Sequence, residues 1–149
     1  MMISPEILRR YPLFADLEDQ FLKEIAMIGD EVVLADGVWL FEEGDAADDW
    51  YVITRGTVEL KAQLPGGQYA DLDELVEGDL VGWSAICNPV NFTLGAVTPT
   101  GARLLKLEGA AMQDLMQKNP EMGFHIMCHI NQVIGTRLTN LRTRFVSMV

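Results

Sequence analysis

The sequence has one long stretch without positive charge. Residues 62–102 contain no Lys, Arg or His, although they include five Asp or Glu residues. Residues 1–100 hold five Lys or Arg against nineteen Asp or Glu, and the whole chain of 149 residues has a formal net charge of −11. Nucleic-acid binding depends on Lys and Arg side chains that neutralise phosphates. The composition therefore argues against nucleic acid as a partner.

Cysteine and histidine are also scarce. Cys87 and Cys128 are far apart in the sequence, and we interpret both as free thiols of a cytoplasmic protein. His125 and His129 could face one metal or haem iron, but no further ligand is placed beside them, so we expect packing histidines and no cofactor. No nucleophile–base pair is recognisable, which argues against an enzyme. No apolar run is long enough for a membrane span or a secretory signal, so we expect no membrane partner.

What is present is a chain of domain size in three blocks. Its 149 residues, 49% of them hydrophobic, suit one domain with a substantial core. Residues 4–29 have helical apolar spacing, and residues 31–107 alternate short apolar stretches with glycine turns, as strands of a barrel or sandwich do. Residues 108–147 return to helical spacing. We predict a single, mainly β domain over residues 1–149 with flanking helices.

The last predicted helix carries an apolar seam with spacings of three and four residues. The seam consists of Met127, Ile130, Ile134, Leu138, Leu141 and Phe145. Such a repeat is close to the 3.5-residue period of a coiled coil. We therefore predict a homodimer through this helix, with Ile126 and Val133 docked on the β block. The alternative is that the seam packs on its own domain.

The order of these features resembles the cyclic nucleotide-binding domain of catabolite-activator-like regulators. The stretch "ADGVWLFEEGDAADDWYVITRGTVEL" is similar to the family's strands around structural glycines, which fall at Gly37, Gly44 and Gly56. "GDLVGWSAI" looks like the start of its phosphate-binding cassette. The resemblance covers roughly residues 10–146. It implies a double-stranded β-helix, a jelly-roll-like β-roll, with N-terminal helices and a long C-terminal dimerisation helix.

The cassette departs from the family pattern at its two charged positions. In the family, a Glu accepts the ribose hydroxyls and an Arg pairs with the cyclic phosphate, within the pattern Gly-Glu and then Pro-Arg-Ala-Ala-Thr. The chain keeps glycine at Gly82 and proline at Pro89, but has Trp83 at the Glu place and Val90 at the Arg place. Losing both contacts predicts a roughly 10³-fold or greater loss of cyclic-nucleotide affinity.

Several roles remain open for the cassette residues. The candidate ligand-binding set is Gly82, Trp83, Ser84, Ala85, Val90, Asn91 and Thr93. Trp83 either fills the pocket or forms a stacking wall for a flat ligand. The polar residues of the set supply ligand contacts or cap turns. From the long helix of a dimer partner, Gln132, Thr136 and Arg137 could reach the pocket. Arg137 is otherwise an exposed flank residue.

The resemblance implies a regulatory module, and the changed cassette suggests its kind. We expect a stand-alone sensor that binds a small ligand other than ordinary cAMP or cGMP. The alternative is a degenerate domain with a filled pocket, acting as a dimerisation or protein-interaction adaptor with an unidentified protein partner. A second alternative is an atypical cyclic-nucleotide binder that relies on backbone amides and Arg137. Transcription factors of the family continue into a helix-turn-helix, which we do not expect in this chain.

Overall fold

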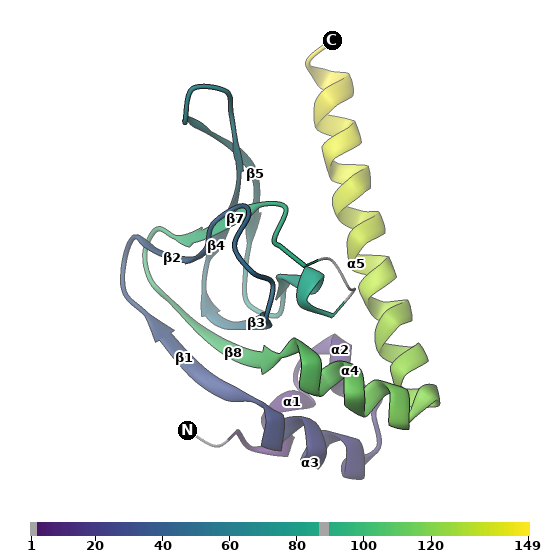
Figure 1. Cartoon of the computed structure of the whole chain (residues 1–149). Helices are drawn as coiled ribbons and strands as arrows, with labels where there is room; N and C mark the ends of the chain where they lie inside the picture. The colour runs from purple at the N-terminus through teal and green to yellow at the C-terminus, as the bar shows by residue number, and fades with distance from the viewer. Residues whose placement is uncertain (1–2, 87–89) are drawn as a thin grey trace.

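The computed structural model describes residues 3–86 and 90–149, and it begins with three short helices (Figure 1). They are α1 (Pro5–Leu8), α2 (Pro12–Ala15) and α3 (Asp19–Ile28). A proline opens each of the first two, at the position where the missing N–H costs nothing. The three helices gather at one end of the β structure, below the strands in Figure 1.

Two antiparallel sheets of four strands each form the body of the domain. The strands are β1 (Asp30–Leu34), β2 (Val38–Phe41), β3 (Asp49–Gly56), β4 (Val58–Gln63), β5 (Tyr69–Leu75), β6 (Leu80–Val81), β7 (Gly95–Thr98) and β8 (Ala102–Glu108). One sheet has the order β1-β8-β3-β6 and the other β2-β7-β4-β5. The predicted fold class, a β-roll with flanking helices, is confirmed.

The glycines that mark the roll occupy turn conformations. Gly37, Gly44 and Gly56 have φ angles of 76°, 94° and 88°. These lie in the left-handed region, which glycine enters without the steric penalty of a Cβ. At Gly56 a Cβ would also lie 2.5 Å from the carbonyl oxygen of Gly101. The glycine spacing in the sequence therefore reports the turns of the roll.

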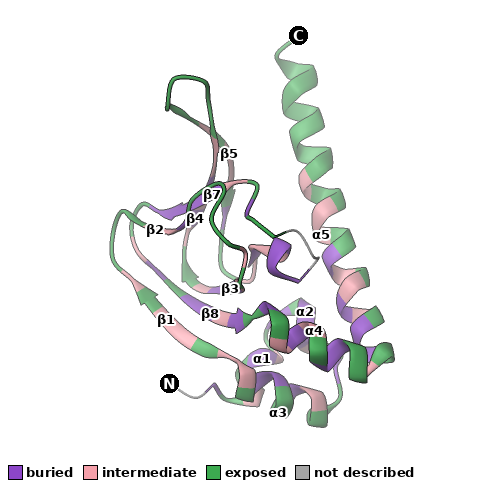
Figure 2. Ribbon diagram, in the orientation of Figure 1, coloured by how far each residue is buried: buried purple, intermediate pink, exposed green. Residues whose placement is uncertain are grey.

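The buried side chains form two clusters. The helix-side core joins α1–α5 to the face of the first sheet that is turned away from the second sheet, and Trp50, Phe14 and Met112 are fully enclosed in it. The roll core lies between the two sheets around Ile53, Val58, Leu104, Phe41 and Phe92. Figure 2 shows buried residues along the strands and in the helices at the lower end of the domain. The candidate pocket described below borders the roll core.

Two helices complete the chain, α4 (Gly109–Lys118) and α5 (Pro120–Ser147). The first half of α5 packs into the helix-side core through Met122, Ile126 and Ile130. Its second half extends beyond the helices, and Figure 2 shows it largely exposed. Among the described residues, no helix combines the length and apolar character needed to cross a membrane.

This packing corrects part of the predicted seam. Ile126 is buried on its own domain as predicted, but Ile130 is also fully enclosed there, with 0% of its surface exposed. Met127 and Ile134 are partly buried against the same helix-side core. Ile130 has no surface left for a partner because the α5 face that bears it is covered by its own chain. Of the predicted seam, Leu138, Leu141 and Phe145 remain exposed.

The cysteine and histidine side chains that the structure describes all lie on α5. Cys128 is an exposed free thiol on α5, and Cys87 lies outside the described residues. His125 and His129 are half-buried on the same helix. Within residues 3–86 and 90–149, no three His, Cys, Asp or Glu side chains are grouped so that they could hold a metal ion.

Candidate functional site

The candidate site begins at the sharp turn after β6. Gly82 has φ 81° and ψ 36°, and it is followed by the 3₁₀ turn η1 (Trp83–Ala85). The N–H of Ala85 donates to the carbonyl of Gly82, which closes this turn. A Cβ at Gly82 would lie 3.1 Å from a ring carbon of Phe92. Glycine is therefore required for both its left-handed backbone and its close contact, and the turn aims Trp83 toward α5.

Arg137 of α5 covers the Trp83 ring. Its guanidinium carbon lies 4.7 Å from the ring centroid, within cation–π range. One guanidinium nitrogen, Nη2, donates a hydrogen bond to the backbone carbonyl of Leu80. Burial lowers the pKa of Arg137, while the charges of Asp79 and Asp73 act in the opposite direction. The two contacts join the long helix to the cassette.

This position corrects the prediction for Arg137. The sequence suggested that it reaches the pocket of a dimer partner, or lies exposed on the flank of a coiled coil. In the structure Arg137 is half-buried and reaches the pocket of its own chain. The reason is that the first half of α5 packs on its own domain, which brings the next turns of the helix over η1.

A small cavity lies beneath Arg137 and Trp83. Its volume is about 30 Å³. The lining residues are Phe41, Leu60, Gly82, Trp83, Ser84, Phe92, Thr93, Leu94 and Arg137. Phe41 and Phe92 stack with centroids 3.6 Å apart and ring planes 11° apart. Such a volume suits one or two water molecules, so a nucleotide does not fit without rearrangement.

Only part of the predicted site gathers at this cavity. Gly82, Trp83, Ser84, Thr93 and Arg137 line it. The other predicted residues are Ala85, Val90, Asn91, Gln132 and Thr136, and none of these five is among its lining residues. Pro89, the proline of the cassette pattern, lies outside the described residues.

The predicted site residues that do not line the cavity lie elsewhere in the fold. Ala85 is buried in the helix-side core, and Val90 is 80% exposed. Asn91 donates its side-chain amide to the carbonyl of Gly44 and bridges Ala46, so it ties the cassette loop to the β2–β3 turn. Sequence reasoning missed the apolar walls, although Phe92 at a small-residue position of the cassette was a usable signal.

A wider groove separates α5 from β5. It has a volume of about 360 Å³ and is lined on the strand side by Asp73, Glu74 and Asp79. The helix side includes Gln132 and Thr136, the two α5 residues that were predicted to reach the pocket. Arg137 lines both this groove and the small cavity, so its side chain stands between them.

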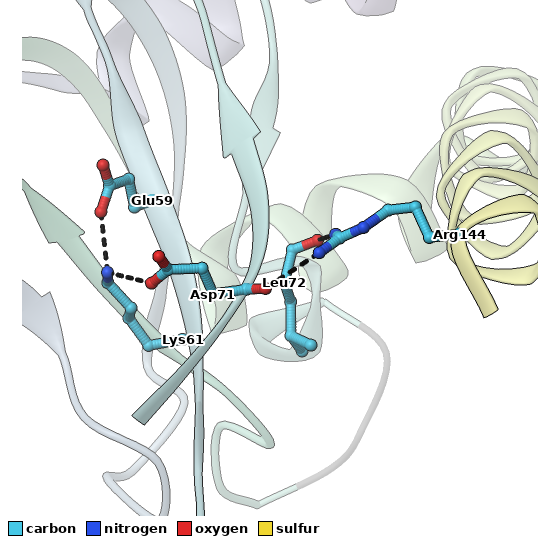
Figure 3. Close-up of polar contacts among 5 residues, drawn as sticks. All are labelled: Glu59, Lys61, Asp71, Leu72 and Arg144. Carbon is cyan, nitrogen blue, oxygen red and sulfur yellow. Dashed lines mark hydrogen bonds and ion pairs between the residues drawn. The ribbon is translucent and has the colours of Figure 1, made fainter. Parts of the chain in front are cut away.

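Further along α5, Arg144 reaches across to β5 (Figure 3). The Arg144 guanidinium donates to the backbone carbonyls of Leu72 and Asp71, the latter at 3.2 Å. The Asp71 side chain pairs with Lys61, whose ammonium also lies 2.8 Å from the Glu59 carboxylate. These contacts connect the exposed half of α5 to the edge strand β5, and through it to β4.

Comparison with known proteins shows which family has this architecture. The family model of the cyclic nucleotide-binding domain matches residues 31–119, more than half of the chain. The chain belongs to the cyclic nucleotide-binding domain family. The match includes the strands of the roll and the cassette turn, and the matched residues supply every lining residue of the small cavity except Arg137 of α5.

Solved structures and curated relatives of this family agree with the fold. A structure from Geobacter metallireducens, described as a cyclic nucleotide-binding protein, is 31% identical with a TM-score of 0.83 and covers 92% of this chain and 99% of that chain. The N-terminal domain of a transcriptional regulator from Streptomyces coelicolor is 32% identical, with a TM-score of 0.71 over 87% and 93% of the two chains.

A curated relative is longer than this chain. The CRP-like cAMP-activated global transcriptional regulator of Mycobacterium tuberculosis is 24% identical over 97% of this chain. The chain spans 62% of that relative's length. The family membership thus describes a regulatory cyclic nucleotide-binding domain.

Proposed function

We propose that this domain is a regulatory module that responds to a small ligand other than cAMP or cGMP. The observation that carries the proposal is the small cavity beneath Trp83 and Arg137, about 30 Å³ in volume. Trp83 stands where the family pattern has the ribose-binding Glu, and its ring is covered by a side chain of the same chain. A cyclic nucleotide would have to displace both groups before it met any polar partner.

The electrostatics of the site support the same conclusion. A charge-assisted contact to phosphate contributes about 1.5–3 kcal/mol. Val90, at the place of the phosphate-binding Arg, is exposed and does not line the cavity. Arg137 is the one cation among the lining residues that the structure describes, and it is engaged with Leu80 and Trp83. A cyclic phosphate would have to compete for it within an acidic protein.

The position of Arg137 suggests how ligand binding would be transmitted. A ligand that enters beside Trp83 displaces or redirects Arg137, and so changes one contact that holds α5 against the roll. A ligand shifts such an equilibrium by its differential affinity for the two arrangements. We propose that the second half of α5 carries the response to a homodimer partner through Leu138, Leu141 and Phe145, which are exposed on it.

The same cavity volume favours a second candidate function. With only about 30 Å³ free, Trp83, Phe92 and Arg137 fill most of the space that a ligand would need. A domain with a filled pocket would act as an adaptor that displays α5 for dimerisation or for another protein. This candidate predicts no ligand response at the cavity.

Thermal melting of the purified chain tests the proposal against both alternatives. We expect no shift with millimolar cAMP or cGMP, and a shift with at least one member of a metabolite panel. A ligand at about 100 times its Kd stabilises the fold by about 2.7 kcal/mol, which raises Tm by several degrees. A shift with cAMP that disappears in Arg137→Gln would instead establish the atypical cyclic-nucleotide binder. No shift with any compound would favour the adaptor.

A further inference from the structure

Arg137 is a half-buried cation that forms no direct ion pair with a described carboxylate, although Asp79 and Asp73 act on it electrostatically. In the part of the chain that the structure describes, no ion pair within 4.0 Å involves it, although seven other ion-pair contacts occur. Its one hydrogen bond to a described group goes to the Leu80 carbonyl, whereas a guanidinium has five N–H donors. Removing such a charge from water is costly unless it is paired. The arrangement leaves donor capacity for an anion at the mouth of the cavity.

The two sides of Arg137 are not equivalent for an anion. On the groove side lie Asp73, Glu74 and Asp79, which repel negative charge. On the cavity side the described walls carry no acidic side chain. An anion that reaches Arg137 is therefore favoured on the cavity side.

The residues that line the cavity indicate which other chemical groups the anion would carry. Two hydroxyl-bearing residues, Ser84 and Thr93, line the cavity beside four apolar ones, Phe41, Leu60, Phe92 and Leu94. One arginine can hold one carboxylate through two parallel N–H···O contacts, but the described walls offer no second cation for a multiply charged phosphate. The flat face of Trp83, now covered by the flat guanidinium, would suit an equally flat group.

We propose that the ligand is a small carboxylate with a flat, apolar body. Its carboxylate binds Arg137, and its body takes the place beside Trp83 and Phe92 that the guanidinium vacates. Arg137 gives up the Leu80 carbonyl in this step, which frees one tether between α5 and the roll. This inference rests on the proposed function and names the ligand class of the same cavity.

Titration of the intact chain with benzoate, followed by NMR of the tryptophan indole N–H groups, tests the inference. Trp83 is assigned with Trp83→Phe, and Trp39 and Trp50 serve as internal references. We expect benzoate to move the Trp83 signal. Arg137→Gln should raise the apparent Kd about 10- to 100-fold, the range expected for a lost charge-assisted hydrogen bond. Arg142→Gln, an exposed site on the same helix, should leave the Kd unchanged.

Further probes separate the failure of this inference from the failure of the proposed function. Benzamide has the shape of benzoate without its charge, and we expect it to bind at least tenfold more weakly. Equal binding of the two compounds, or full binding by Arg137→Gln, would overturn the carboxylate assignment and leave a small-ligand sensor standing. Tight binding of cAMP by the unmodified chain would overturn the proposed function itself. A Trp83 signal unmoved by benzoate overturns the inference.

A folding check keeps the Arg137 variant interpretable. Arg137→Gln is compared with the unmodified chain by circular dichroism and by the positions of the Trp39 and Trp50 signals. Arg137→Lys retains the charge but not the paired N–H geometry. We expect it to bind benzoate with an affinity between those of the other two proteins. If Arg137→Lys bound no better than Arg137→Gln while both were folded, charge would not be what recognises the ligand.

Discussion

The two halves of α5 have the same apolar spacing and opposite environments. In the first half, Met122, Ile126 and Ile130 are at most 2% exposed within the helix-side core. In the second half, Leu138 and Phe145 are 66% and 67% exposed. Figure 2 shows the change along the helix, from buried and intermediate residues to exposed ones. A regular apolar seam on one helix can therefore pack against its own domain over one half and remain free for another partner over the other half.

The forces that hold the two halves also differ. Burial of a large apolar side chain contributes about 1.5–3 kcal/mol, and several such residues fix the first half. The second half is connected to the roll through arginine contacts to backbone carbonyls, from Arg137 to Leu80 and from Arg144 to β5. Elements with few buried contacts open at the lowest free-energy cost. A regulated movement of α5 is therefore cheapest in its second half.

Truncation of one seam residue from each half should separate them most clearly. Ile130→Ala removes a fully buried side chain, and we expect the free energy of unfolding to fall by about 2–5 kcal/mol. Leu138→Ala, its matched control at an exposed position, should change the stability of the single chain by no more than about 0.5 kcal/mol. Urea unfolding at low protein concentration measures both. Equal losses in the two variants would contradict the contrast between the halves.

A charged residue in the exposed half should act on association rather than on folding. If Leu138 and Phe145 meet a second copy, the double variant Leu138→Glu/Phe145→Glu loses apolar burial of about 1.5–3 kcal/mol per residue. The dimer Kd should then rise by at least tenfold, as measured by sedimentation equilibrium.

The first half supplies the control for this experiment. Phe124 is 72% exposed on α5 but lies outside the predicted seam. We expect Phe124→Glu to leave the dimer Kd unchanged. A monomeric unmodified chain, or equal weakening by Phe124→Glu, would show that the exposed seam is not the interface.

The sequence predicted the roll because glycine turns and short apolar strands leave local signals. Gly37, Gly44 and Gly56 have the positive φ angles that such turns need. The partner of the α5 seam was predicted less accurately, because helical spacing identifies an apolar face without identifying what covers it. Ile130 thus fitted a dimer seam in the sequence, although its own domain encloses it.

Only the cassette residues of the candidate site could be predicted from the sequence. Gly82 and Trp83 adjoin each other in a short motif, so their departure from the family pattern was visible. The stack of Phe41 on Phe92 joins residues far apart in the sequence, and it depends on how the sheets fold. The same holds for Arg137 over Trp83, because the register of α5 on its own domain decides which chain the arginine reaches.

The smallest expected effect tests what holds the exposed half of α5. Arg144→Ala removes the donors to the carbonyls of Asp71 and Leu72. These contacts are exposed, so we expect the global free energy of unfolding to fall by less than about 1 kcal/mol. Hydrogen exchange should nevertheless become faster in β5 and in α5 beyond Arg137, while the first half of the helix keeps its protection. Arg142→Ala, two residues away and exposed, is the control. Unchanged exchange in Arg144→Ala would mean that the second half of α5 is held by its association with another chain rather than by β5.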